Sequence, residues 1–307
     1  MKKVLITGAS GLLGSHLVRY FLNQKYNVIG THGSRQLKVD FFKTEKLDLR
    51  DTNSIANFIL SHSPEVVIHS AAATDIDWCE KEIDECNVVN FLATKEVVKA
   101  CKFMGSKLIY ISTPSVFGSN ASNKKLKEGD KLKPRSFYSK TKKNSEDLVL
   151  TYENSVVVRL TPFGHSPSLN HLTDWAISNS IKKNKIFGYT DSIFNPIFAG
   201  NVGFFLEKII SKNAKGALHL GCKNAISKFD FINKVLKSQK IDEDVCSTLM
   251  ANHRKNKNCY RNSNNFLCLD SAEKILETNF QNFDLEIVDF VNYKNSGNYK
   301  NVKLVHQ

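Results

Sequence analysis

Three closely spaced glycines near the N-terminus join a short apolar run to an amphipathic one. Residues 3–7 are apolar and β-branched, which predicts a buried strand, and residues 15–23 carry apolar side chains at helical spacing. Gly8, Gly11 and Gly14 lie at the junction. A strand that enters a helix through such a turn points free backbone N–H groups and the positive end of the helix dipole outward, and these bind a pyrophosphate. The N-terminus therefore predicts an α/β sheet that binds a dinucleotide.

Each glycine has a physical reason in this interpretation: a tight turn at Gly8, close approach of the backbone to phosphate at Gly11, and close helix–strand packing at Gly14. The spacing Gly-x-x-Gly-x-x-Gly after Thr7 resembles the extended branch of the short-chain dehydrogenase/reductase superfamily. An ordinary strand–turn–helix is the alternative. The resemblance implies cofactor contacts at Gly8, Ser10, Gly11, Leu12, Leu13 and Gly14.

Composition excludes several classes of protein. The chain has 307 residues, 41% of them hydrophobic and 24% charged, which is typical of a globular protein. It contains no run of eighteen apolar residues, so we expect no membrane span, and the start leads directly into the first strand, so we expect no signal peptide. The seven cysteines are odd in number and form no Cys-x-x-Cys pair, and the histidines are scattered. We therefore expect reduced thiols in a cytoplasm and no metal site.

The formal net charge of +13 has two interpretations. It could attract anionic ligands such as dinucleotides and nucleotide sugars. It could equally reflect a lysine-rich background whose side chains are solvated. The basic residues are spread along the chain without an aromatic-interleaved patch, so we expect no binding of nucleic acid.

The end of the second predicted strand, residues 26–31, bears on the choice of cofactor. NAD-selective folds carry an acidic residue there for the ribose hydroxyls. This chain has no acid before Asp40 and instead offers Ser34 and Arg35, which could hold a 2′-phosphate. NADPH is therefore favoured over NADH, with NAD as the second choice. The alternative for Arg35 is a solvated loop residue.

Two further segments extend the predicted cofactor site. In the extended reductases an Asp-Leu pair before the next helix, predicted here at 52–62, contacts the adenine, and the resemblance gives this role to Asp48 and Leu49. The strand that follows residue 64 opens into Ala71, Ala72 and Ala73. Small side chains at the carboxyl end of a strand let a cofactor lie across the sheet.

The stretch 71–80, Ala-Ala-Ala-Thr-Asp-Ile-Asp-Trp-Cys-Glu, resembles dTDP-4-dehydrorhamnose reductases and their relatives, among them the regulatory β-subunit of methionine adenosyltransferase. For Asp77 and Glu80, capping of the following helix is the alternative. The helix predicted at 83–105 contains Asn90-Phe-Leu-Ala-Thr, similar to the superfamily's Asn-Val-x-Gly-Thr. The resemblance implies that Asn90 kinks this helix and positions a water beside the active-site lysine. A helix-surface asparagine is the alternative.

Thr113 follows an apolar strand predicted at 107–112. Alignment of the Val-Phe-Gly segment at 116–118 with the family pattern puts Thr113 at the catalytic Ser/Thr position. The chain departs from the reductases by having Pro114 and Ser115 where they have Asp-Tyr, which leaves the sugar open. It also lacks the Asp-Glu pair of the 4,6-dehydratases, which argues against dehydration.

Tyr138 and Lys142 are four residues apart at the start of a predicted helix, so they share one face. A free tyrosine has a pKa of about 10 and is a poor acid at neutral pH. An ammonium one turn away stabilises the phenolate and lowers that pKa. Tyr138 could then donate a proton to a carbonyl oxygen while hydride arrives from a nicotinamide. The resemblance also gives both residues a role in cofactor binding.

Beyond a last strand at 155–160 the alternation of strands and helices becomes less regular. Helices are predicted at 169–183, 201–211 and 229–236, and strands at 186–189, 193–197 and 217–220. We expect a doubly wound parallel Rossmann sheet with a smaller, discontinuous C-terminal lobe. The expected domains are 1–162 for NADP, 163–293 mainly for substrate, with some elements returning to the first domain, and 294–307 as a polar, frayed tail.

The resemblance implies NADPH-dependent reduction of a 4-keto group on a nucleotide-activated deoxysugar. Thr113, Tyr138, Lys142 and Asn90 are the expected catalytic residues. A nucleotide-sugar epimerase shares the same residues and stays open. So does a non-catalytic NADP-binding regulatory subunit, and a homodimer is compatible with all three functions.

Overall fold

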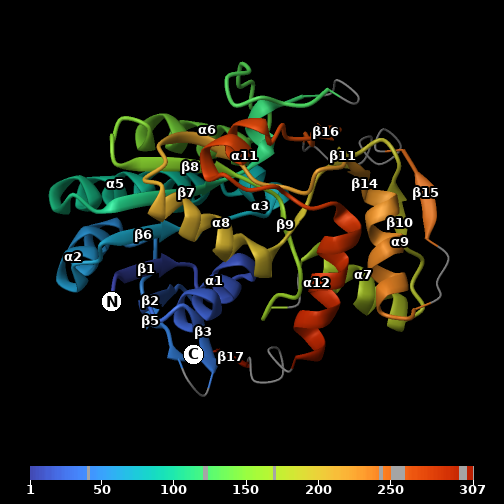
Figure 1. Cartoon of the computed structure of the whole chain (residues 1–307), viewed down its shortest axis with the longest axis horizontal. Coiled ribbons are helices and arrows are strands. Elements are labelled where there is room, and N and C mark those ends of the chain that lie inside the picture. The colour runs from blue at the N-terminus through green and yellow to red at the C-terminus, as the bar shows by residue number, and fades with distance from the viewer. Residues whose placement is uncertain are drawn as a thin grey trace.

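The computed structural model describes residues 1–39, 42–119, 124–168, 171–241, 245–249, 260–296 and 303–306. A parallel sheet in the order β13-β8-β7-β6-β1-β2-β5 forms its centre (Figure 1). Its strands are β1 (Lys3–Thr7), β2 (Asn27–His32), β5 (Glu45–Lys46), β6 (Val66–His69), β7 (Lys107–Ser112), β8 (Ser155–Arg159) and β13 (Gly216–His219). The predicted doubly wound fold is therefore confirmed.

Helices cover both faces of this sheet, which explains why its strands are continuous apolar runs. On one face lie α2 (Thr52–His62), α5 (Ala93–Met104) and α6 (Phe137–Val149), joined to the sheet by a buried core that includes Leu5, Ile55 and Val97. On the other lie α1 (Leu12–Asn23), α8 (Ala199–Ser211) and α11 (Asp270–Leu276), around a core that includes Ile6 and Leu206. The two cores hold the carboxyl edge of the sheet in place.

The second half of the chain divides its elements between two bodies. It supplies β13, which pairs with β8, and α8, which packs against α1. Its other helices, α7 (Leu172–Ile181), α9 (Lys228–Ser238) and α12 (Phe283–Asn295), surround a separate phenylalanine-rich core and lie together at the right of Figure 1. The smaller lobe is thus discontinuous, as predicted. The domain boundary at residue 162 stays a prediction.

Short strands complete this smaller lobe. They are β9 (Pro162–Phe163), β10 (Phe187–Tyr189), β11 (Ile193–Phe194), β12 (Ile197–Phe198), β14 (Ile226–Ser227), β15 (Cys246–Thr248) and β16 (Asn264–Asn265). The strand predicted at 193–197 is split in two at Asn195, whose side-chain amide donates to the carbonyls of Cys222 and Leu267. The amide of Asn195 therefore joins three segments where an unbroken strand was expected.

The helix predicted at 83–105 is interrupted. It consists of α4 (Ile83–Asn87), a π-helical turn η1 (Val88–Leu92) and α5, and it ends at Gly105 in the left-handed conformation. A π-helical turn widens a helix locally and is frequent at functional sites. A π-helical turn therefore contains Asn90, where the resemblance implied a kink.

Two segments differ from what was expected of exposed residues. Arg35 is not a loop residue, the alternative to a phosphate contact, because it begins β3 (Arg35–Val39), which pairs with β4 (Phe42–Lys43). The prediction of a frayed tail was wrong for β17 (Lys303–His306), which pairs antiparallel with β3. Each of the two paired strands has only two apolar residues among polar ones, so its hydrophobic pattern was weak. Residues 297–302, residue 307 and Cys259 lie outside the described residues.

Among the described residues, the structure contains no helix that is both long and apolar enough to cross a membrane. The same residues form no group of three or more potential metal ligands.

Candidate active site

The turn after β1 is closed by glycines that admit no side chain. Gly8 has φ +69°, and a Cβ there would lie 2.8 Å from the Ala71 Cα. A Cβ on Gly14 would overlap the carbonyl oxygen of Gly8. The turn thus packs directly against the segment after β6, and α1 packs directly against the turn. The predicted packing reason for Gly14 is confirmed.

The first turn of α1 faces the same edge. Leu12 and Leu13 bury their side chains in the core, so only their backbone is available for a ligand. Gly11 is the N-cap, Ser10 and Gly11 are half-buried, and no side chain caps the helix. Because the first N–H groups of a helix lack partners within it, this end suits an anionic group. The residues present fit a pyrophosphate, and their contact with one stays a prediction.

A buried polar chain links the ends of β1 and β6 to the interrupted helix. His69 Nδ1 lies 2.8 Å from Thr7 Oγ1, and His69 Nε2 lies 3.1 Å from Thr94 Oγ1. Thr94 Oγ1 in turn donates to the Asn90 carbonyl at 2.7 Å. Burial, with the nearby Lys142 charge, lowers the pKa of His69 to about 3, so the ring is neutral. These hydrogen-bonded side chains had no local signal in the sequence, because they are far apart along it.

Asn90 is buried and holds the segment after β6 from both sides. Its Oδ1 accepts from the Ala73 N–H at 2.8 Å, and its Nδ2 donates to the Ala73 carbonyl at 3.0 Å. Nδ2 also lies 3.2 Å from the hydroxyl of Thr141, the residue before Lys142. Asn90 is therefore not a helix-surface residue. It connects the alanines of the predicted cofactor site, of which Ala71, Ala72 and Ala73 are half-buried, to α6.

Thr113 and Tyr138 meet at the end of β7. Thr113 caps η2 (Pro114–Phe117) by accepting from the Ser115 N–H at 3.2 Å, and its hydroxyl donates to Ser115 Oγ at 3.1 Å. Tyr138 is 8% exposed and packs with the thiols of Cys79 and Cys86. Burial raises the pKa of Tyr138 well above its ordinary value, and the neighbouring Thr113 hydroxyl opposes that rise. In this structure the pKa is therefore raised, not lowered as predicted.

Lys142 does not offset this effect of burial on Tyr138, because its ammonium has other partners. Its Nζ donates to the Ile111 carbonyl at 2.7 Å and lies 4.0 Å from the centre of the Tyr110 ring. The ammonium thus has a backbone carbonyl and an aromatic face as its partners. Burial lowers the pKa of Lys142 to about 7, while the neighbouring Glu146 raises it.

The predicted adenosine contacts lie around β2 and α2. Ser34 is exposed in the bend between β2 and β3, and Arg35 follows it. Asp48 is bound by Arg50 at 2.5 Å, which holds the pKa of that carboxyl below its usual value. Leu49 is buried in the core beside α2. The contacts of these residues with a nucleotide stay predictions.

The acidic residues before α4 have other partners than the predicted cap. In α3 (Ile76–Lys81) the cap is Asp75, which accepts from the Trp78 N–H. Asp77 pairs with Arg261 at 2.8 Å. Glu80 accepts from the Phe137 N–H at 2.6 Å. Glu80 therefore binds the first N–H of α6, the helix that carries Tyr138 and Lys142, while Ser136 is the N-cap of that helix.

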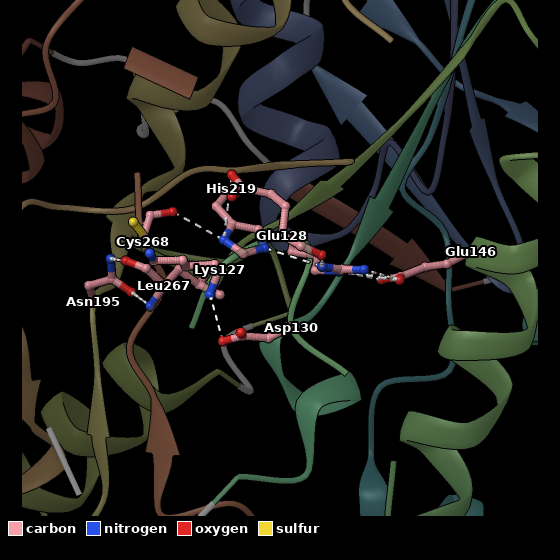
Figure 2. A network of polar contacts seen from close by, with 9 residues as sticks. Lys127, Glu128, Asp130, Glu146, Asn195, His219, Leu267 and Cys268 are labelled. Atoms are coloured by element: carbon pink, nitrogen blue, oxygen red, sulfur yellow. Dashed lines mark hydrogen bonds and ion pairs between the residues drawn. The ribbon is translucent and has the colours of Figure 1, made fainter. Parts of the chain in front are cut away.

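Glu146 on α6 and Arg159 on β8 form a buried ion pair (Figure 2). The Arg159 guanidinium binds Glu146 through Nε at 3.0 Å and Nη2 at 2.7 Å, and its Nη1 lies 3.3 Å from His219 Nε2. Burial, together with the Arg159 charge, lowers the pKa of His219 to about 3, so this ring is neutral. Sequence reasoning missed the pair. Its one sequence signal is that Glu146 follows Lys142 at the same spacing at which Lys142 follows Tyr138.

Comparisons with known proteins agree with this geometry. The family model described as "RmlD substrate binding domain" matches residues 1–295. The chain is 25% identical over 249 residues to the spore coat polysaccharide biosynthesis protein SpsK of Bacillus subtilis, covering 80% of this chain and 83% of that protein. It is 28% identical over 259 residues to the dTDP-4-dehydrorhamnose reductase of Aggregatibacter actinomycetemcomitans, covering 82% of each.

A shorter match is to the subunit of another enzyme. Subunit beta of bovine methionine adenosyltransferase 2 is 34% identical over 149 residues, which cover 48% of this chain and 43% of that protein. Among solved structures, the dTDP-4-dehydrorhamnose reductase of Bacillus anthracis in complex with NADP superposes with a TM-score of 0.83. It is 22% identical, and the match covers 94% of this chain and 99% of that one. That likeness confirms the fold.

Proposed function

The chain belongs to the RmlD substrate binding domain family, and from that membership we propose that it reduces a 4-keto group on a nucleotide-activated deoxysugar with NADPH. The product would serve the biosynthesis of cell-surface polysaccharide. The names of the matched SpsK and reductase relatives support this assignment.

One observation carries the proposal: Tyr138 and Lys142 on α6, Thr113 after β7 and Asn90 in η1 lie at one edge of the sheet, beside the glycine turn. The carboxyl edge of a parallel sheet is where α/β folds bind their ligands. A phenol, an ammonium and a hydroxyl at that edge are the groups that carbonyl reduction needs. An unrelated structural sheet would have no reason to bury them together.

The chain's residues fit a dinucleotide. The turn at Gly8 leaves no room for side chains and ends at a helix N-terminus, and Ser34 and Arg35 support NADPH over NADH. When bound, NADPH would supply a hydride to the carbonyl carbon. Titration of NADPH and NADH by fluorescence measures the preference.

Tyr138 would give its proton to the carbonyl oxygen as that oxygen gains negative charge. Thr113, which neighbours Tyr138, would donate to the same oxygen. Lys142 would stabilise the phenolate that remains, because its ammonium lies on the same helix face one turn away. For that role the ammonium must either leave its hydrogen bond with the Ile111 carbonyl or stabilise the phenolate while it keeps that bond. Asn90 would keep Ala73 and α6 in register with these groups.

We expect Tyr138→Phe to lower kcat at least about a hundredfold, because general acid catalysis contributes roughly 10²–10⁴ in rate. The measurement is NADPH consumption with dTDP-4-dehydrorhamnose, together with NADPH binding, which should persist. Tyr152→Phe is the matched control, because the Tyr152 hydroxyl donates to the backbone carbonyls of Cys101 and Ser106. Tight NADPH binding without turnover of any keto-sugar would exclude the reductase.

Two other functions remain candidates under the same test. A nucleotide-sugar epimerase would interconvert sugars without net consumption of NADPH. A regulatory subunit is favoured by the match to methionine adenosyltransferase subunit beta over 149 residues. It would bind NADPH without turnover and would co-purify with a catalytic partner.

We also propose that the reaction takes place in the cytoplasm. Six described cysteines are free, as expected in a reducing compartment. The homodimer stays a prediction that size-exclusion chromatography with light scattering tests.

A further inference from the structure

Three side chains of α6, each one turn beyond the last, contact three consecutive residues at the end of β7. Tyr138 neighbours Thr113, and Lys142 Nζ donates to the Ile111 carbonyl at 2.7 Å. Glu146 Oε1 accepts from Ser112 Oγ at 2.5 Å. The helix and the strand end are thus joined by two hydrogen bonds, one from the proposed catalytic lysine and one to Glu146, the residue one turn beyond it.

We propose that Glu146 is a positioning residue of this active site, fixing the end of β7 and the charge beside Lys142. The inference rests on the proposed function only in that it takes Tyr138 and Lys142 to be the reacting groups. Glu146 itself lies one helix turn deeper than Lys142 and is fully buried, so it acts through its neighbours.

Glu146 is held in turn by Arg159 at the end of β8. The guanidinium binds both carboxylate oxygens, and the side chains of Glu146 and Arg159 are 1% and 3% exposed. Ser112 pairs in register with Arg159, and Arg159 with His219, so one polar row crosses β7, β8 and β13. Figure 2 shows Glu146 at one end of this row and His219 with Cys268 at the other.

Such a pair is a poor means of stabilising a fold. Burying two charges costs about as much as their attraction returns, and apolar replacements of buried pairs are often neutral or stabilising. A role in placing a neighbouring charge explains its presence better. The nearest functional charge on the same helix is the ammonium of Lys142.

The groups around Lys142 leave Glu146 as its negative neighbour. Tyr110 faces Lys142 from β7, Tyr138 lies on its own helix, and burial keeps both phenols neutral by raising their pKa. His69 on β6 is neutral, because burial lowers its pKa to about 3. Arg159 on β8 is a cation, and its charge is paired with that of Glu146.

Removing one charge or the other should therefore move the pKa of Lys142 in opposite directions. Glu146→Gln removes the negative charge and leaves Arg159 unpaired, which lowers the pKa by about one pH unit. Arg159→Met leaves the negative charge of Glu146 without its cationic partner, which raises the pKa of Lys142. If the substitutions only disturbed the structure, the pKa of Lys142 would shift in the same direction in both variants.

The test is a ¹³C NMR titration of the Lys142 Cε in lysine-labelled protein, with the signal assigned from the spectrum of Lys142→Arg. The double variant Glu146→Gln with Arg159→Met removes both charges, and we expect it to fold even where a single variant does not. It should also lower the pKa of Lys142. Glu286→Gln is the matched control: Glu286 is equally buried, but it bonds the Phe198 N–H in the other lobe.

Kinetics give a second reading. The alkaline limb of kcat should move with the Lys142 titration in each variant, while KM for NADPH changes less than about threefold. If the wild type turns over no keto-sugar, the proposed function fails, and the NMR titration still decides the role of Glu146. An unchanged Lys142 pKa in the double variant, or a lowered one in Arg159→Met, overturns the inference.

Discussion

At the scale of single residues, the site is built from polar groups that are buried with their partners. Asn90 is the clearest case, because one amide satisfies both backbone groups of Ala73 and touches α6. A buried group that loses its partner costs about 1–3 kcal/mol. Ala73 lies beyond the end of β6, and its position therefore depends on this one side chain.

We expect Asn90→Ala to lower the free energy of unfolding by about 2 kcal/mol, because two backbone groups of Ala73 lose their partner. Urea denaturation followed by circular dichroism measures it. Asn87→Ala, one turn earlier on the same helix, is the control and should change stability by less than about 0.5 kcal/mol. Equal losses in the two variants would contradict this account of Asn90.

The identities of the site residues were predictable, but their partners were not. Tyr138, Lys142, Thr113 and Asn90 stand in short motifs of recognisable spacing. Lys142 binds the Ile111 carbonyl, and this bond joins residues of two different elements. The spacing of Tyr138 and Lys142 therefore could not show that the ammonium has a partner other than Tyr138. The pKa of Tyr138 was accordingly predicted with the wrong sign.

At the scale of elements, local patterns predicted bounds well where they alone decide the structure. The strands at residues 3–7 and 107–112 and the helix at 52–62 begin and end as expected. The apolar run at 193–197 fails as one strand because the amide of Asn195 bonds distant segments. β3 and β17 each have only two apolar residues among polar ones, which is too few for a clear periodic pattern.

The contact of α1 with the turn after β1 makes Gly14 the most sensitive position in that element. We expect Gly14→Ala to cost at least about 2 kcal/mol and to abolish NADPH binding, because the added Cβ would overlap the Gly8 carbonyl. Thermal unfolding and NADPH titration measure both effects. At Gly129 a Cβ meets nothing within 4 Å, so Gly129→Ala should match the wild type. A stable, NADPH-binding Gly14→Ala protein would refute the packing argument.

At the scale of the whole molecule, the sheet is completed by the second half of the chain. β13 covers the edge of β8, and α8 covers the face that α1 shares. A fragment that ends at residue 162 would expose both the edge and the face. Exposed edges of apolar strands pair with other chains.

We therefore expect the fragment 1–162 to be insoluble or aggregated, although it contains every predicted catalytic residue. A longer fragment, 1–222, which adds α8 and β13, should be more soluble. Expression of both fragments, followed by sedimentation, measures this. A monomeric, NADPH-binding 1–162 fragment would show that the sheet does not depend on β13.

The late arrival of β13 also has a consequence during translation. Residues 160–215, 56 in number, separate the end of β8 from the start of β13. At roughly 5–20 residues per second, the ribosome needs several seconds to make them. Through that interval the nascent chain carries the whole predicted catalytic set on an unfinished sheet, so the newborn protein should depend on chaperones until β13 has left the exit tunnel.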